Sequence, residues 1–188
     1  MAENIKIDKF RLKYLTKIIK IYKDSFPKEE RFPFIILLLN LIRKNSKLFV
    51  GLKGREAISF MYVINYKKES FILYLAVTEE ERNRGFGSYL LNWYLNNYKN
   101  TNIYLNVDEV DNKYYDNDIR KKRLNFYLSN GFYLTEYLSV EKNGNYNILS
   151  NKDKFDKDNY ADLDSKISYW LFDNKSKIER IENYENRN

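Results

Sequence analysis

Residues 72–99, ILYLAVTEEERNRGFGSYLLNWYLNNYK, combine the signals of a strand, a turn and a helix in one continuous segment. The continuous apolar run at 72–77 is typical of a strand that is buried on both faces. Gly85 and Gly87 then interrupt the apolar pattern where the chain must turn sharply. From Ser88 onward, apolar residues recur at steps of three and four, which predicts a helix with one inward face. The inward residues are Leu90, Leu91, Tyr94, Leu95 and Tyr98.

The start of such a helix can bind an anion. The first backbone N–H groups of a helix have no partner within it and carry a partial positive charge. Glycines before the helix carry no Cβ, so an anion can approach the main chain closely. A pyrophosphate fits a site of this kind, and Arg82 and Arg84 add positive charge beside it.

Spacing separates the nucleotide-binding motifs that place glycines in this way. A P-loop has Lys followed by Ser or Thr after its second glycine, whereas here Ser88 and Tyr89 follow Gly87. The dinucleotide fingerprint has a third small residue where this chain has Leu90. The remaining pattern, RNRGFG at 82–87, resembles the acetyl-CoA pyrophosphate loop of the GNAT N-acetyltransferase superfamily. The alternative is a glycine turn that only joins strand and helix.

A second segment, LNFYLSNGF at 124–132, resembles the Leu-Tyr-x-x-x-Gly-Phe segment of the same superfamily. Tyr127 is the matching tyrosine, four residues before Gly131. The resemblance implies that Tyr127 lies near the cofactor sulfur and acts as the general acid for the leaving thiolate. The alternative is that Tyr127, one of 18 tyrosines, only fills a helix face.

The resemblance also implies which residues would bind acetyl-CoA. The backbone of Leu75, Ala76 and Val77 would meet the pantetheine arm, because splaying from the strand at 102–107 would leave amide groups unpaired. Arg82 occupies the first position of the motif, and the side chain of Arg84 either contributes or is merely exposed. The amides that would bind the pyrophosphate belong to Asn83, Arg84, Gly85, Phe86, Gly87 and Ser88.

Two positions depart from the family pattern. Relatives often carry Asn seven residues before the tyrosine, where this chain has Arg120. Some relatives carry a catalytic Glu on the central strand, but 71–77 holds no carboxylate. We expect the other candidate bases to face solvent, and water can accept the proton of the amine instead. These candidates are Glu56, Glu69, Asp108 and Glu109, and the triple Glu at 79–81 is predicted to be an exposed turn.

Composition excludes several kinds of chemistry. The 188 residues include no Cys and no His, which excludes disulfides, thiolate catalysis, Ser-His-Asp machinery and most zinc sites. We therefore expect no metal. Residues 1–55 carry 14 Lys or Arg and 5 Asp or Glu, but Lys13, Lys17, Lys20 and Lys23 lie opposite an apolar stripe. We favour a solvated helix face over a nucleic-acid site there.

No apolar run is long enough to span a bilayer, and the N-terminus lacks a signal-peptide core. We expect a cytoplasmic protein with no membrane partner. The oligomeric state is left open, with a homodimer as one option.

Apolar periodicity and turn residues predict the remaining elements. Strands are expected at 5–10, 46–52, 57–66, 102–107, 132–141 and 146–150, helices at 12–26, 34–43 and 119–130, and polar turns or loops at 27–33, 51–55, 65–70, 108–118 and 142–145. Pattern alone indicates a mixed α/β protein with a largely antiparallel first half and a crossover helix. The resemblance implies the GNAT fold, an α/β (α+β) class with a mixed, mostly antiparallel central sheet and helices on both faces.

We expect a GNAT domain over 1–150 and an extension over 151–188 that packs on it and frays over its last dozen residues. The predicted anchor of this extension is Ile167, Tyr169, Trp170, Leu171 and Phe172. Aromatic residues near 26–34 and at Tyr114 and Tyr115 hint at a mixed apolar acceptor pocket.

The function expected from these features is acetyl-CoA-dependent transfer of an acetyl group to a primary amine of a small molecule, peptide or protein. Two alternatives differ in class. One is a non-catalytic acyl-CoA sensor or partner-binding module of GNAT fold. The other is an acetyltransferase that acts on charged tRNA through the basic N-terminal third.

Overall fold

A computed structural model describes residues 5–110, 117–142, 144–171 and 176–181. The chain divides into two compact units. The first unit comprises Met1–Tyr66 and Ile72–Lys99, and the second comprises Lys67–Phe71 and Asn100–Asn188. The strands are hydrogen-bonded in the order β1-β2-β3-β4-β5-β7-β6-β8, and β4 and β5 run parallel in a mostly antiparallel sheet. The predicted fold class is confirmed.

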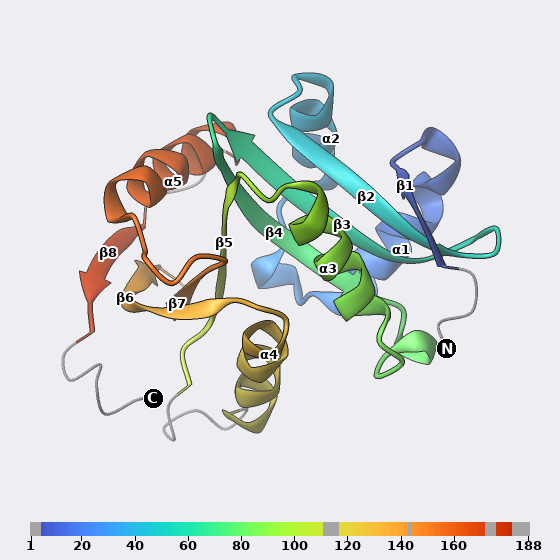
Figure 1. Ribbon diagram of the computed structural model, residues 1–188. Helices are drawn as coiled ribbons and strands as arrows, with labels where there is room; N and C mark the ends of the chain where they lie inside the picture. The colour runs from blue at the N-terminus through green and yellow to red at the C-terminus, as the bar shows by residue number, and fades with distance from the viewer. Residues whose placement is uncertain (1–4, 111–116, 143, 172–175, 182–188) are drawn as a thin grey trace. The chain divides into compact units, whose positions relative to one another are not determined.

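From residue 5 onward, where its description begins, the first unit contains four strand segments, three helices and short 3-10 turns (Figure 1). The strands are β1 (Ile5–Lys9), β2 (Ser46–Lys53), β3 (Glu56–Tyr66) and the end of β4 (Glu69–Val77). The helices are α1 (Leu15–Ser25), α2 (Phe34–Ile42) and α3 (Phe86–Asn97). The 3-10 turns are Leu12–Tyr14, Lys28–Glu30 and Glu79–Glu81.

Helices α1 and α3 cover opposite faces of the first unit's strands. The Tyr22 ring of α1 lies 6.3 Å from the Phe60 ring of β3. The Tyr94 ring of α3 lies 5.5 Å from Phe49, which pairs with Met61 on β3. Because successive side chains of a strand point to opposite faces, Phe60 and Met61 mark the two sides. In Figure 1, α3 lies in front of these strands and α1 lies behind them.

Contrary to the prediction from the sequence, strand β4 is not buried on both faces over residues 72–77. Ile72, Tyr74 and Ala76 are buried on the α1 side, but Leu73, Leu75 and Val77 alternate with them and are only half-buried. The apolar run over 72–77 is therefore fully covered on one face only, because an apolar sequence alone does not reveal what covers each side.

Both predicted turns of the first half are shorter than expected. Strand β2 continues to Lys53, and Gly54 with φ +61° forms the hairpin turn in place of 51–55. Gly51 lies within the strand, where a Cβ would collide with the Ser59 hydroxyl. Strand β3 likewise runs to Tyr66 and β4 begins at Glu69, so the predicted turn at 65–70 comprises two residues.

The described residues of the second unit form four further strands and two helices. The strands are β5 (Asn102–Asp108), β6 (Tyr133–Glu141), β7 (Gly144–Ser150) and β8 (Lys177–Arg180). The helices are α4 (Asn117–Ser129) and α5 (Lys157–Leu171). The first three residues of β4 pair in parallel with β5, from Glu69↔Asn102 to Phe71↔Tyr104.

The extension contributes α5 and β8 to the second unit. Tyr160 of α5 is fully buried and donates a 2.9 Å hydrogen bond to Asn106 Oδ1 of β5. Of the predicted anchor, Ile167 and Leu171 are buried, but Tyr169 is 75% exposed and does not anchor the helix. Residues 177–180 form a strand paired with β6 instead of fraying.

The partition into a domain over 1–150 and an extension stays a prediction. Phe172, Tyr114, Tyr115 and residues 182–188, on which parts of the predictions rest, lie outside the described residues. Within the described ranges, every helix is too short or too polar to cross a membrane.

Candidate active site

The turn before α3 reverses the chain through two residues with left-handed backbone conformation. Asn83 has φ +60°, and Gly85, the residue that caps α3, has φ +84°. A glycine is suited to this position because a side chain would be strained there. Apart from Gly85 itself and its two chain neighbours, no atom of the described residues lies within 4 Å of the place where a Cβ of Gly85 would sit, so the main chain is open on that side.

The first turn of α3 presents backbone donors. No side chain caps the helix, and no acidic residue lies in its first turn. The Tyr89 N–H donates a 2.9 Å hydrogen bond to the Gly85 carbonyl and so starts the helical ladder. The N–H groups of Phe86, Gly87 and Ser88 precede it and are the donors that a helix start leaves for an anion. The residues present therefore fit a pyrophosphate.

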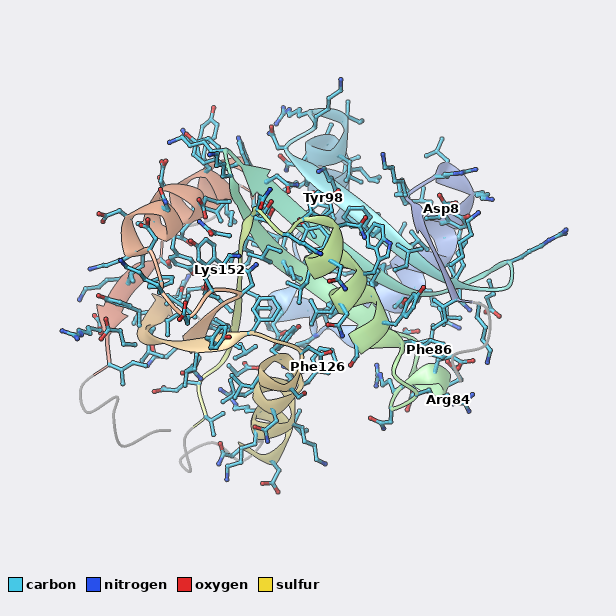
Figure 2. All side chains as sticks on the ribbon, in the orientation of Figure 1. Asp8, Arg84, Phe86, Tyr98, Phe126 and Lys152 are labelled. Carbon is cyan, nitrogen blue, oxygen red and sulfur yellow. The ribbon has the colours of Figure 1, made fainter. Side chains whose placement is uncertain are left out.

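Glu81 forms ion pairs that link the turn before α3 to strand β2. Its carboxylate lies 2.9 Å from Lys53 Nζ on β2 and 3.2 Å from Arg84 Nη1. The hydrogen bond from Lys53 is the main cause that lowers the pKa of Glu81. Arg84 lies on the outside of the turn before Phe86, the first residue of α3 (Figure 2). The prediction of a simple exposed turn at 79–81 is therefore wrong for Glu81, which forms a bridge that local sequence does not reveal.

The two arginines of the motif, Arg82 and Arg84, make different contacts. Arg84 has a side chain that is 60% exposed and engages Glu81. Arg82 is exposed, and its Nε lies 3.4 Å from the Val77 carbonyl at the end of β4. The side chain of Phe86 is buried, so this residue offers a ligand only its backbone amide.

Leu75, Ala76 and Val77 lead into this turn. Leu75 and Val77 are half-buried and Ala76 is buried. The parallel β4–β5 ladder has three residue pairs and ends at Phe71↔Tyr104, so Leu75, Ala76 and Val77 lie beyond its last pair.

Tyr127 lies in the second unit, near the C-terminal end of α4. Its half-buried ring packs against Phe126 and Phe132 at 5.0 Å and 6.0 Å. The helix ends at Ser129, Gly131 follows it with φ +86°, and the Phe132 N–H donates to the Tyr127 carbonyl at 3.2 Å. Burial raises the pKa of Tyr127 to about 12, although the nearby Arg123 opposes the shift. The phenol is therefore protonated at neutral pH, as a proton donor must be.

Arg120, at the position of the family's Asn, binds the end of β5. Its Nη1 donates to the Glu109 carbonyl at 3.3 Å and lies 3.8 Å from Asp108 Oδ1. Arg123 binds the other Asp108 oxygen at 2.8 Å. These contacts give Arg120 a structural role in joining α4 to β5.

The candidate bases are not all solvent-facing as predicted. Glu56 is exposed and pairs with Lys17 at 2.6 Å. The prediction is wrong for Glu69 and Glu109, which are only 6% and 4% exposed, and Asp108 is largely covered by its arginines. Glu69 accepts a 3.1 Å hydrogen bond from Asn102, and Glu109 accepts one of 3.3 Å from Asn145. Both carboxylates thus link neighbouring strands. The sequence does not reveal these links, because it does not show which residue lies opposite a carboxylate.

Residues 44–134 match the family model of the acetyltransferase (GNAT) domain. This segment belongs to the GNAT family. It includes β4, the turn before α3, and Tyr127. The match of this segment supports an acyltransferase enzyme. No curated protein matches the chain significantly.

Solved GNAT structures resemble most of the chain. A Bacteroides thetaiotaomicron protein described as a GNAT-family acetyltransferase has 18% identity and a TM-score of 0.69, covering 87% of this chain and 96% of its own. An aminoglycoside 6'-N-acetyltransferase complexed with coenzyme A has 15% identity and a TM-score of 0.64, covering 80% and 99%. Arabidopsis thaliana Naa50, in complex with a bisubstrate analogue, has 20% identity and a TM-score of 0.61, covering 80% and 99%. At these identities the resemblance establishes the GNAT fold.

Proposed function

We propose that the protein is an N-acetyltransferase that moves an acetyl group from acetyl-CoA to a primary amine of a small molecule, peptide or protein. The observation that carries the proposal is the open, left-handed Gly85 at the start of α3, whose first-turn amides of Phe86, Gly87 and Ser88 no side chain caps, within a segment that matches a GNAT domain. An anionic group at this helix start is favoured by both the donors and the helix dipole.

In this proposal, the amides from Asn83 to Ser88 bind the pyrophosphate of coenzyme A, and Arg82 adds a charge-assisted hydrogen bond. The pantetheine arm follows the backbone of Leu75, Ala76 and Val77, since these residues lie beyond the last pair of the β4–β5 ladder. From the family resemblance we assign Tyr127 to the sulfur end of the cofactor.

The chemistry needs no metal. The free amine attacks the thioester carbonyl, the C–N bond forms, the C–S bond breaks, and the amine releases its proton to water. Tyr127 donates a hydrogen bond to the departing sulfur. Because its pKa of about 12 lies above the usual 8.5 or so of a thiol, the phenol keeps its proton at equilibrium and stabilises the thiolate chiefly as a donor.

Two structural neighbours support the acceptor and donor classes. One is an aminoglycoside 6'-N-acetyltransferase with coenzyme A, and the other is Naa50 with the analogue CoA-Ac-MVNAL. The first acts on a small-molecule amine, and the analogue bound to the second joins coenzyme A to a peptide. We extend the same classes of acceptor to this chain.

The test is to titrate acetyl-CoA and then measure release of free thiol with a panel of primary amines, peptides and charged tRNA. Tyr127→Phe should lower kcat by about 10²-fold or more with little change in the affinity for acetyl-CoA. Tyr133→Phe, which alters a tyrosine that is 50% exposed on the neighbouring strand, is the matched control and should keep full activity. Tight acetyl-CoA binding without transfer to any amine would instead indicate a non-catalytic acyl-CoA-binding module.

A further inference from the structure

Helix α2 presents an apolar stripe to solvent. Ile35, Leu39 and Ile42 are 62%, 39% and 75% exposed, and their spacing of four and three residues places them on one side of the helix. Leu37 and Asn40, on the opposite side, are buried. An amphipathic helix normally turns its apolar side inward, whereas α2 is apolar on both sides.

Helix α1 lies on the same face of the strands as α2. The Tyr22 ring of α1 contacts Phe60 of β3, and the Leu37 carbonyl of α2 accepts a 2.9 Å hydrogen bond from the Tyr62 hydroxyl of the same strand. Phe60 and Tyr62 are two residues apart and so point to one face. The Tyr22 and Phe34 rings also meet, at 5.5 Å. The solvent-facing sides of α1 and α2 therefore lie on the same side of the first unit.

The outer side of α1 is cationic. Lys20 and Lys23 are exposed, as is Lys13 just before the helix. Residues 12–44 hold eight Lys or Arg and three acidic residues, a net charge of +5. The acidic residues are Asp24, Glu29 and Glu30, and Lys17 of the same helix pairs with Glu56. Arg43 and Lys44 follow α2 directly.

We propose that this surface, the outer sides of α1 and α2 over residues 12–44, binds an anionic phospholipid bilayer. Aliphatic side chains of α2 would enter the headgroup boundary, while the surrounding lysines and arginines attract the anionic headgroups. A second copy fits less well, because a two-fold interface would bring two cationic surfaces together. RNA fits less well because the exposed side chains of α2 are aliphatic and offer no ring for base stacking.

This inference does not depend on acetyl transfer. It differs from the sequence-based expectation of no membrane partner, which rested on the absence of a spanning run and did not consider attachment to the surface.

The test is sedimentation of the full chain with vesicles of equal parts phosphatidylcholine and phosphatidylglycerol, compared with vesicles of phosphatidylcholine alone. We expect binding to the anionic vesicles only. Lys20→Gln with Lys23→Gln should weaken binding by about fivefold for each lysine removed. Lys121→Gln with Lys122→Gln, on α4, makes the same change in net charge and should leave binding nearly unchanged.

A second pair of variants tests the apolar stripe. Ile35→Ser with Ile42→Ser should abolish most of the remaining binding without a loss of fold, since both side chains are exposed. Tyr169→Ser, which removes a side chain that is also 75% exposed, is the matched control.

Three results would overturn the proposal: no binding to the anionic vesicles, equal weakening by the α4 variants, or no effect of the isoleucine variants on binding. Self-association that the isoleucine variants abolish, in place of vesicle binding, would assign the surface to a second copy. Salt-sensitive binding to tRNA without vesicle binding would assign it to nucleic acid.

Discussion

The hydroxyl groups of Tyr22 and Tyr74 lie 3.1 Å apart and together hold the connection between α1 and α2. The Tyr74 hydroxyl donates to the Glu30 carbonyl at 2.8 Å and accepts from the Phe32 N–H at 3.2 Å. The Tyr22 hydroxyl also reaches the Phe32 carbonyl, at 3.0 Å. Two phenols from α1 and β4 thus replace the hydrogen bonds that this irregular segment cannot make to itself.

Tyr74→Phe should lower the free energy of unfolding by about 1–3 kcal/mol, because it leaves the Glu30 carbonyl and the Phe32 N–H without their shared partner. The measurement is urea unfolding, together with limited proteolysis of residues 28–33, which should become faster. Tyr146→Phe, a tyrosine substitution in the second unit, is the control for proteolysis. Unchanged stability and unchanged cleavage of the segment would contradict the role given to Tyr74.

Gly85→Ala should weaken coenzyme A binding, because alanine at φ +84° costs roughly 1–2 kcal/mol and shifts the amide donors. Gly54→Ala is a close match: its φ is +61°, nothing lies within 4 Å of the added Cβ, and it sits in the β2–β3 hairpin. Both variants should lose similar stability, and only Gly85→Ala should lose coenzyme A affinity in calorimetric titration. Equal affinities for the two variants would count against the pyrophosphate site.

Arg82→Ala should reduce the affinity for coenzyme A by about tenfold, because a charge-assisted hydrogen bond to phosphate is lost. Arg84→Ala should reduce it by only about twofold to threefold, since that guanidinium is exposed and already engages Glu81. Calorimetric titration at one fixed ionic strength measures the difference. The reverse order of effects would show that Arg84 leaves Glu81 to bind the phosphate.

Tyr62 should make the fold sensitive to alkali. Burial raises its pKa from 10.0 to about 12, so the folded protein holds the phenol proton more tightly than the unfolded chain. This contribution is fully present below pH 10 and is lost as the pH rises from 10 to about 12, an effect of about 3 kcal/mol.

Tyr62→Phe isolates that effect from those of other tyrosines. Below pH 10 the variant should be less stable, because it loses the 2.9 Å hydrogen bond to the Leu37 carbonyl and the 2.6 Å contact with Ser46. Its deficit should shrink as the pH approaches 12, as measured by urea unfolding at each pH. Parallel stability curves for the two proteins would refute the assignment.

The sequence allowed the strand, turn and helix over 72–99 to be predicted because three local signals agree there. The apolar run, the glycines and the helical spacing each specify one element, and their order leaves few folds. The end of α4 just before Gly131 was also predictable, since a glycine after a helix readily adopts the left-handed conformation that terminates it.

What sequence could not reveal depends on contacts between distant segments. Glu69 and Glu109 look like surface carboxylates until Asn102 and Asn145, more than 30 residues away along the chain, are placed beside them. Tyr169 belongs to an aromatic cluster in sequence, yet the buried aromatic residue of α5 is Tyr160. Periodicity shows that a helix has an inner side, but the strands that it packs against decide which side that is.

Strand β8 has only four residues, three of them charged, and Arg180 binds Glu136 of β6 through two nitrogens. A short, charged outer strand is a poor template for further pairing, so it shields the backbone of β6 from other chains. Shortening the protein before residue 177 would uncover β6 from Tyr137 to Val140 and leave a row of unpaired amides beside apolar side chains. Solubility at high concentration, and not only folding, would then depend on strand β8.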